Sequence, residues 1–159
     1  MFERSDRLKK DHNRDYATEA FRYWAAVGCP TYENALGRII KRAQEKAKGQ
    51  PAEVKAAFID ACIEQRMGAL LDIKACDECF KYLNAHGKEC VCSAVREVYM
   101  AFPRKRLARG ELSGRVVRFG MDNYYSSAQV YRFLEEACDR FVENRGLRAF
   151  SEDDVLMFE

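Results

Sequence analysis

The sequence predicts an all-α fold in which an N-terminal helical unit is followed by a C-terminal helix-turn-helix. Apolar residues recur every three or four positions through most of the chain, which is the period of an amphipathic helix. Apolar residues make up 48% of the 159 residues and charged residues 33%, and only three prolines interrupt the pattern. This composition is typical of a folded helical protein, and the length allows one domain or a small domain with a helical extension.

The first predicted helix begins after a charged leader, where Asp15 can act as the N-cap. Its apolar face consists of Tyr16, Ala20, Phe21, Tyr23, Trp24 and Val27. Gly28 and Pro30 end the helix, since glycine accepts a left-handed backbone and proline cannot continue the hydrogen-bond ladder.

Thr31 can cap a second helix, which is basic on one side. Its inward positions are Leu36, Ile39, Ile40, Ala43 and Ala47. The opposite face carries Arg38, Lys41, Arg42, Lys46 and Lys48. A basic face on a short amphipathic helix is most often simply solvated, and the alternative is a contact with nucleic acid or with an acidic partner.

The clearest break in the chain is Gly-Gln-Pro at residues 49–51, with Pro51 suited to the first position of the next helix. That helix can extend over residues 52–85, and at 1.5 Å per residue it would span roughly 50 Å. Because this is long for so small a protein, we expect a kink or break near residues 67–68. The helix should end at His86 and Gly87.

A further helix is predicted from Lys88 to Met100, and Pro103 stops it. The loop that follows carries four basic side chains within six positions: Arg104, Lys105, Arg106 and Arg109. Residues 95–122 as a whole hold seven basic and three acidic side chains. Because such close positive charges repel one another, we expect a negative partner such as a phosphate backbone to lie against them.

The stretch from Leu112 to Phe141 predicts two helices joined by a tight turn. The first helix carries Leu112, Val116, Phe119 and Gly120 on one face, and the second, capped by Ser126, carries Val130, Phe133, Leu134, Ala137, Cys138 and Phe141. Gly120 suits the small position where the helices of a helix-turn-helix cross. Because Tyr124 occupies the turn position that usually holds glycine, we expect Asn123 to adopt the left-handed backbone angle.

The outer face of the second helix is then free to enter a DNA groove. It presents Ser127, Gln129, Tyr131 and Arg132. A packed helical hairpin with solvated tyrosine and arginine side chains shows the same pattern, so both interpretations stay open. The carboxylates of Glu135, Glu136 and Asp139 would repel phosphates unless they point away.

Little in the sequence indicates catalytic or metal chemistry. The odd number of cysteines, seven, and their helical spacing argue against a disulfide framework. Cys76, Cys79, His86 and Cys90 come close to a zinc-knuckle spacing, but their surroundings are helical and lack the turns that such a site needs. Zinc at these residues stays an open question, and no cofactor is predicted. His12 and His86 are the only histidines, and no phosphate-binding glycine loop is present, so we do not expect an enzyme.

No apolar run approaches the roughly 20 residues of a membrane span. The first ten residues also lack the apolar centre of a signal peptide. We therefore expect no membrane contact and a cytoplasmic location.

Several motifs in residues 94–148 resemble one known family. They are AVREVY at 94–99, GELSGRV at 110–116, the segment 126–134 with its Val-Tyr-Arg, and RGLR at 145–148. This region is similar to the C-terminal helix-turn-helix of phage late-gene transcription regulators of the RinA and ArpU type, which in turn resembles region 4 of sigma factors. The stretch DYATEAFRYWAAVGCP at 15–30 also looks like the opening of such proteins.

The resemblance implies a DNA-binding transcriptional regulator of phage or mobile-element origin. Residues 1–87 would form a helical unit that is a candidate dimerisation surface, 88–148 the helix-turn-helix domain, and 149–159 a tail. Candidate phosphate contacts are Arg104, Lys105, Arg106, Arg109, Arg115 and Arg118. The recognition helix would offer Ser126, Ser127, Gln129, Tyr131 and Arg132, of which Gln129 and Arg132 are the best candidates to read base edges.

Two other functions fit the sequence. The protein can be a binding module that contacts RNA polymerase or a sigma factor, which the acidic second helix suits. It can also be a small DNA-packaging subunit, similar to a small terminase subunit, which should assemble into a ring. The DNA target, the direction of regulation and the oligomeric state do not follow from the sequence.

Overall fold

A computed structural model describes residues 2–147 and 156–157 of the protein, with side chains from residue 12 onward. Within these residues the chain forms seven α-helices and no strand, which confirms the all-α class. The helices are α1 (Phe2–Ala26), α2 (Tyr32–Lys46), α3 (Ala52–Gln65), α4 (Met67–Ala85), α5 (Glu89–Val98), α6 (Glu111–Asn123) and α7 (Ser127–Arg145). None of the described helices has the length and apolar character needed to cross a membrane. Most of the expected tail, 149–159, lies outside the described residues.

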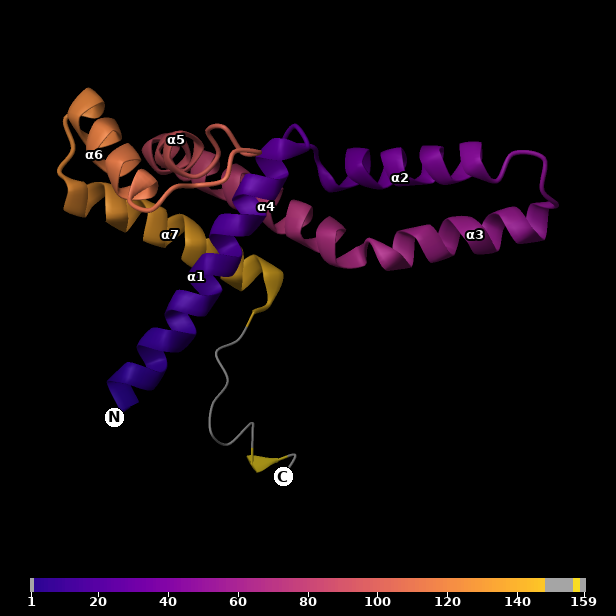
Figure 1. Ribbon diagram of the computed structural model, residues 1–159, viewed down its shortest axis with the longest axis horizontal. Helices are drawn as coiled ribbons and strands as arrows, with labels where there is room; N and C mark the ends of the chain where they lie inside the picture. Colours follow the sequence, from indigo (N-terminus) through magenta and orange to yellow (C-terminus); the bar gives the residue numbers. More distant parts are fainter. Residues whose placement is uncertain (1, 148–155, 158–159) are drawn as a thin grey trace.

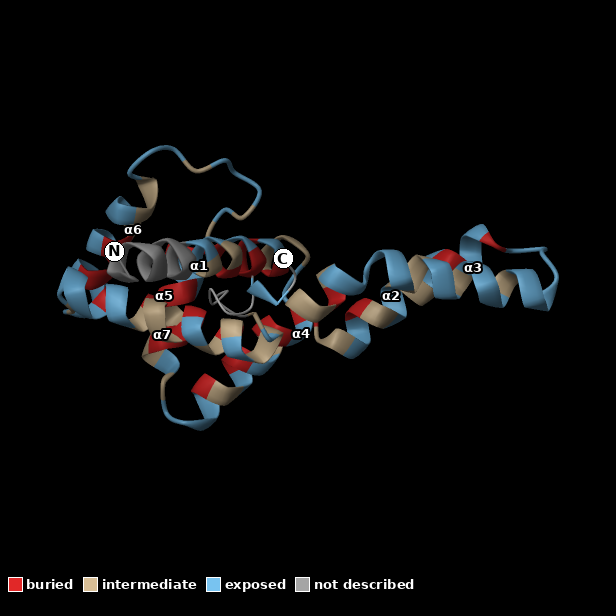
Figure 2. Cartoon of the chain, turned by 90° about the horizontal axis from the view of Figure 1, so that it is seen from below, coloured by how far each residue is buried: buried red, intermediate tan, exposed pale blue. Residues whose placement is uncertain are grey.

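The helices form a packed body from which one arm projects (Figure 1). Helices α1, α4, α5, α6 and α7 make up the body, whereas α2 and α3 run side by side away from it. We call residues 32–65 the arm. Its buried apolar side chains are Ala35, Ala43 and Ala47, and α3 contributes none. Most of the arm surface is therefore in contact with solvent (Figure 2).

Helix α7 is the element that the other helices of the body share, since it contacts α1, α4, α5 and α6. The apolar stripe predicted for it is buried at Val130, Leu134, Ala137, Cys138 and Phe141. Complete burial of one large apolar side chain contributes about 1.5–3 kcal/mol. This single face of α7 therefore supplies a large part of the driving force for folding of the body.

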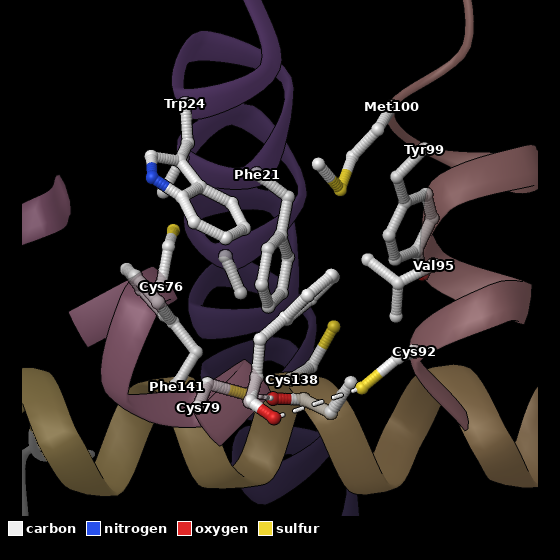
Figure 3. Packing of buried hydrophobic residues seen from close by; sticks show 14 of the residues in the cluster. Phe21, Trp24, Cys76, Cys79, Cys92, Val95, Tyr99, Met100, Cys138 and Phe141 are labelled. Atoms are coloured by element: carbon white, nitrogen blue, oxygen red, sulfur yellow. Dashed lines mark hydrogen bonds between the residues drawn. The ribbon is translucent and has the colours of Figure 1, made fainter. Parts of the chain in front are cut away.

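An aromatic cluster joins α1, α4 and α7 at the centre of the body (Figure 3). The Phe21 ring packs against Phe80 and Phe141, with centroids 5.9 and 5.6 Å away, and Trp24 meets Phe80 edge to face at 5.0 Å. These contacts join residues on the two sides of position 87. The regions 1–87 and 88–148 consequently share one continuous hydrophobic core.

Helix α1 begins at Phe2, so the prediction that Asp15 caps it is wrong. The leader contains neither glycine nor proline, and nothing in it prevents the helix from extending toward the N-terminus. The predicted end is confirmed. Gly28 adopts a φ of +90°, and the Trp24 indole Nε1 donates to the Pro30 carbonyl at 2.9 Å, which fixes the turn into α2.

The cap and the break predicted around the arm are both confirmed. The Thr31 hydroxyl oxygen accepts a hydrogen bond from the Asn34 amide at 3.2 Å. The long helix expected over residues 52–85 breaks at Arg66, which separates α3 from α4. The break lets the two helices pack on different partners. Helix α3 packs on α2, whereas α4 packs on α2, α1 and α7.

Helices α6 and α7 meet at a tight corner built around Gly120. A Cβ atom at this position would lie 2.6 Å from the Tyr125 carbonyl oxygen and 3.6 Å from Val130 Cγ2. The Tyr125 amide in turn donates to the Gly120 carbonyl at 2.8 Å. The backbones thus approach too closely for any side chain, which is why glycine is needed where the sequence predicts a small residue.

Tyr124, rather than Asn123, adopts the left-handed conformation at this corner, with φ +62° and ψ +37°. The expectation for Asn123 is wrong because its amide Nδ2 donates to the Phe119 carbonyl at 2.9 Å, which ties Asn123 to the last turn of α6. The left-handed region costs a non-glycine residue roughly 1–2 kcal/mol. The Tyr124 side chain is 96% exposed and recovers none of this by packing.

The close approach at Gly120 predicts the effect of a single methyl group. Gly120→Ala should lower the free energy of unfolding by about 1–3 kcal/mol, because the Tyr125 carbonyl must move to accommodate the Cβ. Gly114→Ala in the same helix is the matched control. No atom lies within 4 Å of the Cβ built there, so helix propensity alone should stabilise the protein by about 0.5–1 kcal/mol. Urea unfolding curves measure both, and equal effects of the two substitutions would contradict this account of the corner.

Candidate nucleic-acid interface

The basic segment between α5 and α6 is held to the body by a buried arginine, Arg22 of α1. Arg22 is only 6% exposed. The guanidinium donates to the carbonyls of Tyr99 at 2.9 Å and Lys105 at 2.6 Å, and more weakly to those of Phe102 and Pro103. Burial of a charge is costly unless its donors are satisfied, and here backbone oxygens satisfy them. Arg22 therefore fixes the path of the segment that carries the candidate phosphate contacts.

A second arginine, Arg115 of α6, donates hydrogen bonds to the end of α5 and the start of this segment from the other side. Its Nη1 donates to the Val98 and Ala101 carbonyls, both at 2.9 Å, and its Nη2 lies 3.4 Å from a Glu111 carboxylate oxygen. The Arg115 side chain is only 10% exposed. The sequence assigns Arg115 to a phosphate contact, but the structure places its guanidinium inside the protein, where it ties α6 to the end of α5.

Glu111, the first residue of α6, neutralises part of the positive charge around it. Its carboxylate accepts hydrogen bonds from the Ala108 amide at 2.8 Å and the Lys105 ammonium at 3.1 Å. These donors, the backbone amide first, hold the pKa of Glu111 below its usual value. Glu111 is thus ionised and helps to hold the loop in place. Among the described residues, Lys105 is the loop cation with which it pairs.

The remaining predicted cations are free at the surface. Arg104, Arg106 and Arg109 in the loop and Arg118 on α6 are exposed. No ion pair within the described residues involves any of them. Lys105 is also accessible, with 63% of its side chain exposed. These five side chains can therefore reach an external anion without breaking a buried contact.

The start of α7 is fixed by a reciprocal capping box between Ser126 and Gln129. The Ser126 hydroxyl accepts from the Gln129 amide at 3.2 Å, and the Gln129 side-chain oxygen accepts from the Ser126 amide at 2.9 Å. Such a box stabilises a helix start. It also occupies the Gln129 oxygen that would accept from an adenine. Ser127, Tyr131 and Arg132 are further exposed polar side chains of this first turn and the next.

Two acidic side chains of α7, Glu135 and Glu136, pair with cations outside this helix. Glu135 lies 3.5 Å from the Arg14 guanidinium of α1, and Glu136 pairs with Lys88, which precedes α5. Both pairs are partly exposed and contribute little stability. Their effect is local, since each of these two carboxylates has a cation within reach.

Four of the seven cysteines lie in the core of the protein. Cys76, Cys79, Cys92 and Cys138 are buried, and burial raises the pKa of the Cys79 and Cys138 thiols to about 12. His86 instead stacks on Tyr82 at a centroid distance of 4.0 Å. Among the residues that the structure describes, no three histidine, cysteine or acidic side chains converge as metal ligands would.

Arg22 is the main residue of this region that sequence reasoning misses. It directly follows Phe21 on a helix face that reads as apolar, and one charged residue beside such a stripe usually points to solvent. Its partners are backbone carbonyls 77 to 83 residues away, and every type of residue carries a backbone carbonyl. No sequence signal marks this contact.

No known protein family, curated protein or solved structure matches this chain. The function proposed below therefore rests on the resemblance of residues 94–148 and on the geometry and charge of the protein's own surfaces.

The hydrogen bonds from Arg22 to the loop predict that replacing Arg22 lowers the stability of the protein and the order of the loop. Arg22→Met keeps most of the side-chain volume but leaves several carbonyls without a donor, so the free energy of unfolding should fall by about 2–3 kcal/mol. Trypsin should then cleave after Arg104, Lys105 or Arg106 at least about ten times faster in the native protein. Arg38→Met is the control, since Arg38 is exposed and donates one bond, to Val27. Unchanged cleavage in Arg22→Met would refute the positioning role.

Proposed function

We propose that this protein binds double-stranded DNA through the loop 102–110 and the α6–α7 corner, as a transcriptional regulator of phage or mobile-element origin. The proposal rests on the concentration of exposed positive charge along this stretch of the chain. Arg104, Lys105, Arg106, Arg109, Arg118 and Arg132 are all exposed. The intervening acidic residues are Glu111, which is engaged within the loop, and Asp122. A protein that neutralises phosphates needs this kind of exposed cationic surface.

The fixed backbone around these cations supports the same conclusion. Arg22 holds the loop and the Ser126 capping box holds the start of α7. The backbone that carries the cations therefore has little conformational freedom left to lose when a partner binds. Ordering long side chains on binding costs free energy, and a preset backbone reduces that cost. The two-helix corner closed at Gly120 has the close helix approach that a helix-turn-helix requires.

The candidate contacts divide into two roles. Arg104, Lys105, Arg106, Arg109 and Arg118 are assigned to phosphates, with the hydroxyls of Ser126, Ser127 and Tyr131 as further backbone contacts. Arg132 is the best candidate for a base edge, because a guanidinium binds guanine O6 and N7 with two parallel hydrogen bonds. Gln129 can read adenine only after its oxygen leaves the Ser126 amide.

A specific feature favours a second function, contact with RNA polymerase or a sigma factor. The outward face of α6 exposes Val117 and Met121, which lie one turn apart and are 49% and 75% accessible, and Tyr124 follows at the corner. Apolar side chains contribute little to phosphate contacts but are typical of a protein interface. A complex with polymerase that resists salt, together with no DNA binding, would favour this alternative.

DNA binding through the loop predicts that the affinity for DNA falls steeply with salt, and that the loop cations account for a measurable part of this dependence. Fluorescence anisotropy with random duplex DNA should show binding at about 50 mM salt that weakens sharply as salt rises. The triple variant Arg104→Ala/Lys105→Ala/Arg106→Ala should reduce the slope of log K against log salt by roughly 2–3, since each lost phosphate contact accounts for about 0.9. The matched control Lys41→Ala/Arg42→Ala/Lys46→Ala removes three charges from α2. Absence of binding, or equal slopes in the two triple variants, counts against the proposal.

Direct readout by Arg132 predicts a loss of preference at one base pair. After a preferred site has been selected, Arg132→Ala should reduce discrimination at that position by about 1–3 kcal/mol. Arg132→Lys is the informative companion, because it keeps the charge but loses the planar fork that binds guanine. Competition binding with single-base variants of the site measures both. Retention of full preference in Arg132→Ala would remove this residue from the recognition surface.

A further inference from the structure

A groove of about 500 Å³ lies between α2 and the start of α4, beside the end of α1. Its floor is apolar and includes Val27, Ile39, Leu70 and Ile73. The volume is that of a typical ligand or peptide pocket. The groove is formed where the arm joins the body, far along the chain from the α6–α7 corner.

The rim of this groove is strongly basic. Five of its lining residues are cationic, Arg38, Lys41, Arg42, Lys46 and Arg66, against the single acid Glu45. Arg38 donates to the Val27 carbonyl at 3.1 Å. The other four cations form no ion pair within the described residues. An apolar floor with an unpaired cationic rim fits an occupant that is apolar at one end and anionic at the other.

The residues that follow α7 have this chemistry. Three consecutive carboxylates, Glu152, Asp153 and Asp154, precede the apolar run Val155 to Phe158, and no basic residue lies after Arg148. Within this segment Leu156 and Met157 are described, and they are 64% and 80% exposed. Two adjacent large apolar side chains in contact with water leave a considerable area available for docking.

The end of α7 lies close enough for this segment to reach the groove. The Asn144 side chain donates to the Ala75 carbonyl at 3.3 Å and Arg145 pairs with Asp72 at 2.8 Å, so α7 ends against α4 (Figure 1). From Ala75 to Arg66 the helix rises only about 14 Å, and its thickness is about 10 Å. The nine residues from Leu147 to Leu156 can span roughly 30 Å when extended.

We propose that residues 152–158 dock into the groove of their own chain. In this docked state, which differs from the exposed placement of Leu156 and Met157, the three carboxylates would lie against Arg42, Lys46 and Arg66, and the side chains of Val155 to Phe158 would cover the apolar floor. The tether favours the same molecule as the host, because a short linker gives the segment an effective concentration in the millimolar range. This inference does not depend on DNA binding.

Photo-crosslinking in the full chain tests this docking directly. With p-benzoylphenylalanine at position 158, irradiation should attach the C-terminal segment to peptides that contain Ile39, Leu70 or Ile73, in a product of monomer mass. The charge reversal Arg42→Glu/Lys46→Glu should lower the yield about tenfold or more, because it places like charges against the segment. Adding Glu152→Lys/Asp153→Lys/Asp154→Lys to that variant should restore most of the yield.

Lys48→Glu is the matched control, since Lys48 is exposed on the same arm but does not line the groove. It should leave the crosslinking yield unchanged. Attachment to residues outside the groove would overturn the proposal. A product of dimer mass would also overturn it, because the occupant would then be a second copy. A yield that the charge reversal does not lower, or that the compensating reversal does not restore, would remove the electrostatic basis for docking.

Discussion

The backbone carbonyls that follow α5 are the constraint on which the arrangement of the other helices depends. A helix leaves its last carbonyls without internal partners, and the partial negative charge there attracts cations. Two arginines from opposite sides supply the donors. Arg22 of α1 and Arg115 of α6 together reach the carbonyls of Val98, Tyr99, Ala101, Phe102, Pro103 and Lys105. Through these bonds, helices far apart in sequence are fixed relative to one another by polar contacts rather than by apolar packing alone.

The central position of α7 divides its surface between structure and recognition. Its buried stripe joins α1, α4, α5 and α6, and its carboxylates at 135 and 136 face cations of the body. The exposed hydroxyl and cationic side chains of α7, those of Ser127, Tyr131 and Arg132, lie in its first turns. A surface limited to the start of one helix can read only a few base pairs. In the proposed complex with DNA, most of the affinity would then come from the loop and α6.

The sequence predicts local features well and long-range contacts poorly. The C-terminal end of α1, the Ser126 cap, the break near residue 67 and the need for Gly120 all follow from backbone rules that act within a few residues. The role of Arg115 and that of Arg22 do not, because their partners are carbonyl oxygens that every residue carries. The start of α1 was misplaced for a related reason. A residue that can cap a helix also tolerates its interior, and only the flanking chain decides between the two.

The projection of the arm makes its unfolding separable from that of the body. Because α3 buries no side chain and α2 buries only small ones, the arm can open at a lower free energy than the core around Phe21 and Phe141. Opening would remove the α2 wall of the groove while leaving the aromatic cluster, α7 and the α6–α7 corner intact. We therefore expect the arm and the body to unfold with different stabilities, and loss of the arm to leave the surface proposed to meet DNA unaltered.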